Sequence, residues 1–193
     1  MTTRETTASS RREELLELAY AYVLRHGLAD LSLRPLAADI GSSPRVLLFL
    51  FGNKDGLIRA LLSRARAEEV SLLAELESRT GGSLSKVAGE LWGWLSTPER
   101  RPVLALWLES YARSLVDPSG PWAGFARATV DDWLDLLATT QDPEIRDTEQ
   151  GRSDRTVVLT VLRGALLDLL ATGDTARTTK AVTAQLATLA KSA

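Results

Sequence analysis

Residues 31–57 read LSLRPLAADIGSSPRVLLFLFGNKDGL, and the interpretation of the whole chain starts from this stretch. Its first half carries apolar side chains at the spacing of one helix face, at Leu33, Leu36, Ala37 and Ile40. Gly41 ends this helix, and Ser43-Pro44 opens another, because Ser suits the N-cap and Pro the first helical position. Two short helices joined by a tight turn are typical of a helix-turn-helix, whose second helix enters the DNA major groove. The stretch therefore predicts a DNA-binding motif.

The rest of the chain also carries helical signals. Residues 1–10 are rich in Ser and Thr and are expected to form a mobile arm, and residues 141–151 are polar and expected to be irregular. No segment alternates between apolar and polar residues as a half-buried strand would. We expect an all-α fold of about nine helices, at about residues 11–25, 33–40, 44–50, 54–79, 84–96, 98–116, 122–139, 153–171 and 174–191.

Composition narrows the function classes. The chain has no Cys and a single His, which argues against disulfides, thiolate zinc sites, His-rich metal sites and His-dependent triads. The carboxylates Glu109, Asp131, Asp132 and Asp135 show neither paired acid/base spacing nor a Glu-x-x-His motif. We expect no enzyme, no catalytic residue, no metal and no cofactor. The polar start and the lack of an 18-residue apolar run predict a cytoplasmic protein without signal peptide or membrane partner.

Charge is distributed unevenly along the chain. The net charge is −2, yet residues 1–60 hold eight Lys or Arg against seven Asp or Glu, and the remainder is acidic. A dimer with a few well-placed phosphate contacts does not need a high overall pI. The charge pattern is therefore compatible with double-stranded DNA as a partner.

The spacing of Gly41, Ser43, Leu47, Phe51 and Lys54 resembles the DNA-binding motif of the TetR family of bacterial transcriptional regulators. The pair Leu36-Ala37 is similar to the family's usual Ile-Ala, and residues 168–174 resemble the turn between its last two helices. The resemblance implies a helix-turn-helix DNA-binding domain over residues 1–53. It also implies a helical ligand-binding and dimerisation domain over residues 54–193.

Two positions depart from the family pattern. Leu48 replaces the usual Tyr and Leu50 the usual His, so that residues 46–51 are all apolar. The family's Tyr hydroxyl commonly reaches a DNA phosphate, and its loss is expected to cost about 1 kcal/mol of binding free energy. Leu48 could instead touch a thymine methyl group.

The candidate DNA contacts lie in and around the second helix of the motif. Arg45 is a candidate for a bidentate contact with guanine or for a phosphate contact, and the alternative is a solvated surface Arg. Ser32 and Ser43 are expected first of all to be helix N-caps, and the backbone N–H groups at these positions could also hold phosphates. Lys54 matches the family's phosphate-binding Lys. The full set is Ser32, Arg34, Ser43, Pro44, Arg45, Leu48 and Lys54.

Aromatic side chains are concentrated between residues 92 and 133. They could line an apolar cavity for a small apolar or aromatic effector, which the family resemblance implies, or they could form a solid aromatic core. The candidate ligand-binding residues are Trp92, Trp107, Tyr111, Trp122, Phe125 and Trp133. Glu109 and Arg113 are the polar side chains nearest to them along the chain.

The last two helices carry wide apolar stripes, which suggests a second copy of the chain as partner. The candidate homodimer residues are Val158, Val161, Leu162, Ala165, Leu166, Leu169, Val182, Leu186 and Leu189. We expect a homodimeric repressor that a small molecule releases from a palindromic operator. The alternative is a binding module of the same fold, with weakened or lost DNA recognition, that acts through protein or ligand contacts.

Overall fold

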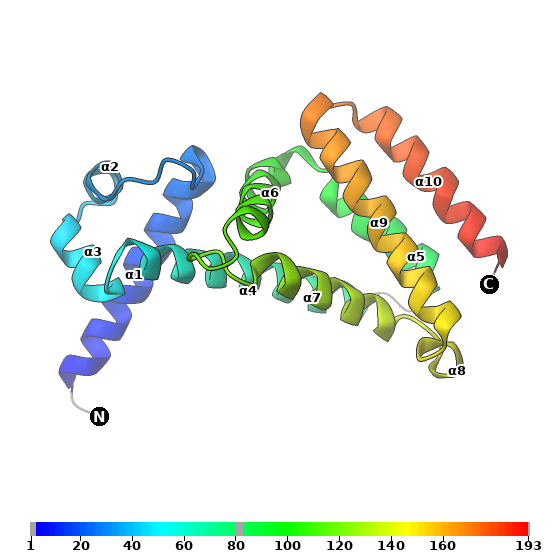
Figure 1. The fold of residues 1–193 in the computed structure, drawn as a ribbon, viewed down its shortest axis with the longest axis horizontal. Helices are drawn as coiled ribbons and strands as arrows, with labels where there is room; N and C mark the ends of the chain where they lie inside the picture. Colours follow the sequence, from blue (N-terminus) through cyan, green and yellow to red (C-terminus); the bar gives the residue numbers. More distant parts are fainter. Residues whose placement is uncertain (1–2, 80–82, 193) are drawn as a thin grey trace. The chain divides into compact units, whose positions relative to one another are not determined.

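The computed structural model describes residues 3–79 and 83–192, and in these residues it contains helices and no strands. Its α-helices are α1 Thr3–His26, α2 Leu33–Asp39, α3 Pro44–Phe51, α4 Lys54–Arg79, α5 Leu84–Leu95, α6 Arg101–Val116, α7 Phe125–Thr139, α8 Pro143–Arg146, α9 Glu149–Thr172 and α10 Thr175–Ser192 (Figure 1). A short 3-10 helix, Pro98–Arg100, precedes α6. The expected all-α fold is confirmed. None of the described helices is both long enough and apolar enough to cross a membrane.

Helix α8 is one more helix than the nine expected, and it occupies part of the stretch predicted to be irregular. Asp142 caps it by accepting a hydrogen bond from the Glu144 N–H at 3.0 Å, and Pro143 follows at the first position. These are ordinary helix-start signals. The sequence pattern missed α8 because a four-residue helix is too short to show apolar periodicity.

The predicted N-terminal arm differs from the structure. Helix α1 begins at Thr3, so residues 3–10 are helical. The Ser9 hydroxyl lies 3.3 Å from the Glu13 carboxylate, and Arg11 pairs with Glu14 at 2.6 Å. Such pairs three and four residues apart support a helix even where Ser and Thr propensities are poor.

Two further helix starts shift from their expected places. Helix α7 begins at Phe125, so Trp122 lies in the preceding turn, which ends at Gly124 with a φ of +76°. Helix α9 begins at Glu149, where the Thr148 hydroxyl accepts a hydrogen bond from the Gly151 N–H at 3.0 Å. In both places a local turn or cap, rather than apolar periodicity, sets the boundary.

The chain divides into two compact units. Unit 1 comprises residues 1–68 and 102–126, and unit 2 comprises residues 69–101 and 127–193. Helix α4 therefore belongs to both units. The division expected after residue 53 separates DNA binding from ligand binding and dimerisation. The boundaries of the two compact units do not test this functional division, so it stays a prediction.

Unit 1 has a core built from α1–α4 and from α6 with the turn that follows it. Helix α1 contributes Leu15, Ala19 and Val23, and the helix-turn-helix contributes Leu36, Ala37, Leu47 and Phe51. Leu57 and Leu61 of α4 complete this side, and Leu106, Trp122 and Phe125 close the core. The helix-turn-helix is thus held from inside by apolar contacts.

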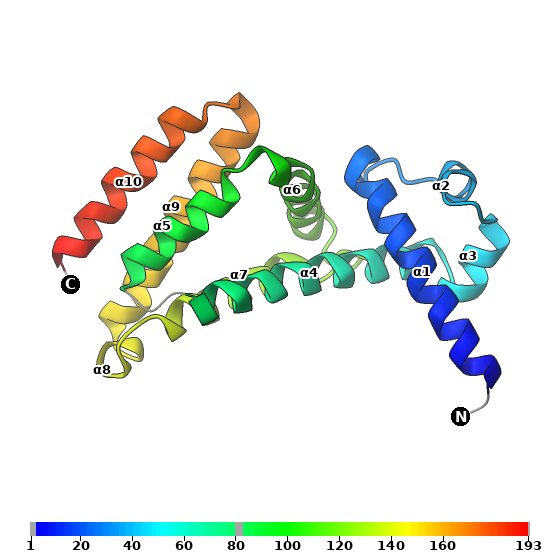
Figure 2. The same cartoon turned by 180° about the vertical axis from the view of Figure 1, so that it is seen from behind.

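Unit 2 is centred on α5, α9 and α10, which lie side by side in both views (Figures 1 and 2). Gly173, with a φ of +71°, ends α9 in the left-handed conformation that glycine adopts most readily. Across this turn Arg177 of α10 pairs with Asp168 of α9 at 2.7 Å. Its hydrogen bonds to Asp168 lower the pKa of that carboxyl group.

Candidate nucleic-acid interface

A tight turn sets the direction of α3. Gly41 has a φ of +63°, and the Ser42 N–H donates to the Ala37 carbonyl at 2.8 Å. The Ser43 side chain then caps α3 by accepting a hydrogen bond from the Val46 N–H at 3.3 Å. The positive φ favours glycine at residue 41, and Ser43-Pro44 starts the next helix as expected.

The two sides of α3 differ in burial. Leu47 and Phe51, four residues apart, are buried in the unit 1 core. Arg45, Leu48 and Phe49 share the opposite side and are exposed, Leu48 by 40% and Phe49 by 81%. The core thus anchors α3 by one face and leaves the other available to a partner.

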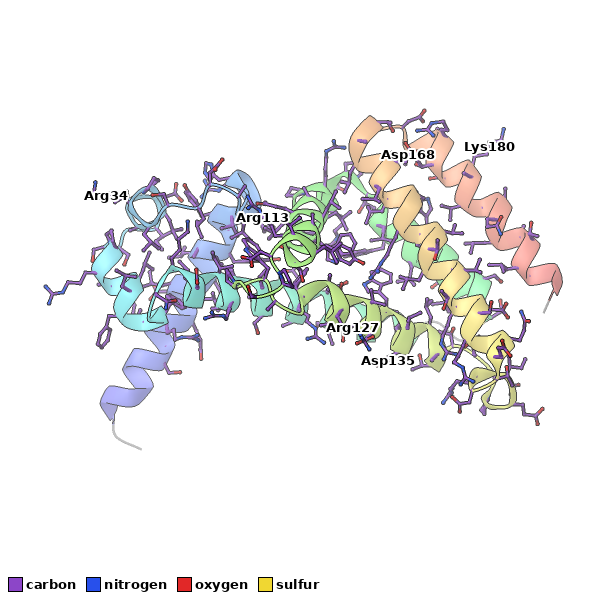
Figure 3. The ribbon with its side chains drawn as sticks, in the orientation of Figure 1. Arg34, Arg113, Arg127, Asp135, Asp168 and Lys180 are labelled. Carbon is purple, nitrogen blue, oxygen red and sulfur yellow. The ribbon has the colours of Figure 1, made fainter. Side chains whose placement is uncertain are left out.

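The three cations predicted to contact DNA are all exposed. Among the described residues, Arg34, Arg45 and Lys54 have no hydrogen bond or ion pair with another protein side chain. Figure 3 labels Arg34 on α2, at the outer edge of the helix. In contrast, Arg25 pairs with Asp39 at 2.7 Å. Cations without a protein partner are available for phosphates or bases.

The N-cap residues around the motif differ in whether their side chains form a capping hydrogen bond. Ser32 occupies the N-cap position of α2 with an extended backbone, but its side chain makes no capping hydrogen bond, which corrects that part of the prediction. Asn53 caps α4, because its side-chain oxygen accepts a hydrogen bond from the Gly56 N–H at 2.7 Å. A Cβ atom at Gly56 would lie 2.0 Å from the Phe51 carbonyl oxygen, so glycine permits the close approach of α4 to the end of α3. Lys54, the first residue of α4, is separated from α3 by two residues only.

Glu109 of α6 was missed as a structural residue of the DNA-binding unit. One of its carboxylate oxygens accepts a hydrogen bond from the Leu28 N–H at 2.9 Å, in the turn between α1 and α2. A Cβ atom at Gly27 would lie 3.2 Å from the same oxygen. The two partners are 81 residues apart in the chain, so no local signal could reveal the contact. Through it, α6 is attached to the helix-turn-helix within unit 1.

Replacing Glu109 by alanine is expected to lower the free energy of unfolding by about 1.5–3 kcal/mol, the range for a hydrogen bond to a charged group. Glu109→Gln keeps an acceptor oxygen for the Leu28 N–H, so its expected loss is about 1 kcal/mol or less. Urea denaturation followed by circular dichroism measures both losses. Equal losses in the two variants would show that the hydrogen bond contributes nothing.

The six candidate ligand-binding residues fall into both units. Trp107, Tyr111, Trp122 and Phe125 belong to unit 1, where Trp122 and Phe125 are core residues. The rings of Trp107 and Tyr111, four residues apart on α6, lie with their centroids 5.1 Å apart and their planes tilted by 36°. Trp92 and Trp133 are buried in unit 2, where they donate hydrogen bonds to Thr179 and Glu69. Trp107 and Tyr111 are both half-buried, so part of each ring is accessible to a ligand.

Most of the candidate homodimer residues are covered within the chain itself. Six of them are buried where α9 and α10 pack on each other and on α5, namely Val158, Leu162, Leu166, Leu169, Val182 and Leu186. Val161, Ala165 and Leu189 are half-buried. The apolar stripes therefore have an intrachain role that periodicity could not distinguish from a dimer contact.

The described part of the chain holds no cluster of His, Cys, Asp or Glu suited to a metal ion.

Helix α3 is held in the core by one face, follows a tight turn and has the exposed cations Arg34, Arg45 and Lys54 on and around it, which is the arrangement of a helix-turn-helix DNA-binding protein. The chain is 31% identical over 173 residues to the HTH-type transcriptional repressor AcnR of Corynebacterium diphtheriae, which covers 88% of this chain and 86% of the relative. A TetR transcription regulator of Haloarcula marismortui has the same fold, with a TM-score of 0.74 at 18% identity over 95% of this chain and 98% of that one. The chain belongs to the TetR family of transcriptional regulators, and its function is regulatory rather than enzymatic.

A second solved structure shares the fold and was determined with a bound small molecule. It is the multidrug binding protein EbrR complexed with imidazole, with a TM-score of 0.64 at 25% identity over 92% of this chain and 89% of that one. No family model matches the sequence.

Proposed function

We propose that the chain is a homodimeric repressor that binds a palindromic DNA operator and is released by a small apolar or aromatic molecule. The observation that carries the proposal is the face of α3. One face of α3 is buried in the core through Leu47 and Phe51, and the opposite face exposes Arg45 beside apolar side chains. AcnR, the 31% identical relative, is itself named a repressor. A regulator of this kind acts where the bacterial chromosome lies, in the cytoplasm.

The DNA contacts follow from the chemistry of the exposed groups. Arg45, in the first turn of α3, offers its guanidinium fork to the O6 and N7 atoms of a guanine. Lys54 and Arg34 flank α3 along the chain and neutralise phosphates, which positions the helix without reading sequence. The backbone N–H groups at the start of α3, beside Ser43 and Pro44, can hold one more phosphate. Leu48 adds an apolar contact in the groove.

The homodimer is supported by the exposed positions of the last two helices. On α9 the exposed positions from residue 156 to residue 171 carry no charge, and they are Thr156, Thr160, Gly164, Leu167 and Ala171. On α10 no charged residue occurs between Ala181 and Ala190. The scarcity of charged residues and the small size of most of these side chains both suit close contact with a second copy of the chain. We call the dimer face the five exposed positions of α9 named above together with the exposed positions of α10 between residues 181 and 190.

The effector site is proposed at the aromatic pair of α6. Trp107 and Tyr111 lie on either side of Glu109 in sequence, and Glu109 bonds the turn that precedes α2. A ligand stacked on this pair would shift α6, and with it α4, which spans both units. The recognition helices would then leave the register of the major groove, provided that the ligand binds the two dimer geometries with different affinities. The EbrR complex with imidazole supports a planar, partly apolar effector.

A salt titration of operator binding tests the proposal. The wild-type protein is expected to bind DNA from upstream of its own gene, and the logarithm of its association constant should fall linearly with log salt concentration. Lys54→Ala is expected to reduce that slope by about 1 per protomer, since one phosphate contact is removed. Fluorescence anisotropy with labelled DNA measures both, and the same complex serves to screen effectors for release. Absence of wild-type binding at low salt would refute the proposal.

A further inference from the structure

Phe49 stands out on the surface of the DNA-binding unit. Its side chain is 81% exposed in the middle of α3, whereas Phe51 on the other side of the same helix is buried in the core. Leaving a Phe side chain in water forgoes about 1.5–3 kcal/mol that its burial would contribute. Because Phe49 contributes no core packing, its ring is available to whatever α3 binds.

The surroundings of Phe49 indicate the charge of that partner. Arg45 lies one helical turn before Phe49 on the same face of α3, and Arg34 and Lys54 carry two further cations near this helix in sequence. None of the three has an ion-pair partner in the described part of the chain. An apolar protein surface would leave these charges uncompensated, and a nucleic acid would neutralise them. Duplex DNA is therefore the occupant that the charges favour.

The chemistry of the major groove decides which base an exposed Phe ring prefers. Thymine presents an apolar 5-methyl group there beside its O4 acceptor, and no other unmodified base presents a methyl group that a Phe ring could contact. On the basis of the proposed operator binding, we propose that Phe49 is a specificity-determining residue. Its ring contacts the 5-methyl group of one thymine in each operator half-site.

The helix geometry also gives the position of that thymine. Arg45 and Phe49 are four residues apart, which corresponds to about 6 Å along the axis of an α-helix. Successive base pairs in duplex DNA are separated by about 3.4 Å. For a helix that lies along the groove, the thymine read by Phe49 is thus about two base pairs from the guanine read by Arg45.

Methyl deletion in the DNA tests the contact directly. Each thymine of the bound upstream DNA is replaced in turn by deoxyuridine, which removes the 5-methyl group and keeps the base pair. For wild-type protein we expect one thymine per half-site to respond, with affinity falling about 4-fold per half-site and about 15-fold when both are replaced, the value of one buried methyl group. Phe49→Ala is expected to bind the thymine operator more weakly and to lose this response to deoxyuridine.

Val116→Ala is the matched control, because Val116 is an equally exposed apolar side chain, 82% accessible, at the end of α6 and outside the proposed contacts. It should respond to deoxyuridine as the wild type does. Unchanged thermal unfolding of Phe49→Ala confirms that the variant is folded, as expected for an exposed position.

The possible failures are distinguishable. If the wild type binds the upstream DNA but no thymine responds, or Phe49→Ala responds as the wild type does, the assignment of Phe49 is wrong and the proposed function stands. If the wild type binds no DNA at low salt, both the assignment of Phe49 and the proposed function are wrong.

Discussion

Arg45→Ala is expected to weaken operator binding by about 30-fold to more than 10,000-fold. A bidentate Arg–guanine pair contributes about 1–3 kcal/mol of discrimination, and a dimer loses two such pairs. The variant should remain folded, since Arg45 is exposed and has no ion pair within the described residues. Anisotropy titrations at constant salt measure the loss, together with relaxed preference for guanine at one position of each half-site.

Two variants separate the geometry of Arg45 from its charge. Arg45→Lys keeps the positive charge but lacks the planar fork, so its affinity should lie between those of the wild type and Arg45→Ala. Arg127→Ala removes an equal charge from α7, where Arg127 pairs with Asp131 at 3.0 Å, and should bind DNA normally. If Arg45→Ala binds the operator as tightly as Arg127→Ala does, α3 does not read the DNA through Arg45.

Leu167→Glu is expected to dissociate the homodimer. Leu167 is 47% exposed on the dimer face of α9, so the carboxylate is tolerated in a single chain. In a two-fold dimer it would bury two unpaired charges, and one uncompensated buried charge already costs about 3–5 kcal/mol. The dimer dissociation constant should therefore rise by at least about 1,000-fold. Operator affinity should fall with it, because a lone subunit engages only one half-site.

Analytical ultracentrifugation over a concentration series measures the dissociation of Leu167→Glu. The matched control is Leu115→Glu, which places the same charge at an exposed Leu of α6 in unit 1. The control should sediment as the wild type does. A dimeric Leu167→Glu protein, or a monomeric wild type, would show that this part of α9 is not the interface.

The helix-turn-helix could be located from the sequence because its signals are local. Gly41 supplies the positive φ of the turn, Ser43-Pro44 opens α3, and Asn53 caps α4. Each of these acts on backbone groups a few residues away, so the order of residues is sufficient to predict it. The TetR-family resemblance rested on the same segment, and the AcnR relationship confirms it.

For the apolar stripes of α9 and α10, the sequence could not predict which surface covers them. Val158, Leu162 and Val182 were expected to meet a second copy, and in the structure they are buried by their own neighbours, α5 included. Helical periodicity identifies which side chains must be covered, but it carries no information about which surface covers them. Leu167 and the small residues near it, which lie outside those buried stripes, became visible as a candidate interface only once the packing of unit 2 was known.

The order of residues alone determined the all-helical class, the position of the turn at Gly41 and the identity of the cations beside α3, because these depend on backbone propensity and side-chain chemistry. Tertiary packing decided that Phe49 faces solvent while Phe51 faces the core, and that Glu109 of α6 bonds the Leu28 N–H. Both outcomes depend on groups brought together from distant parts of the chain. Their contacts exist only after the core has formed, so local spacing cannot encode them.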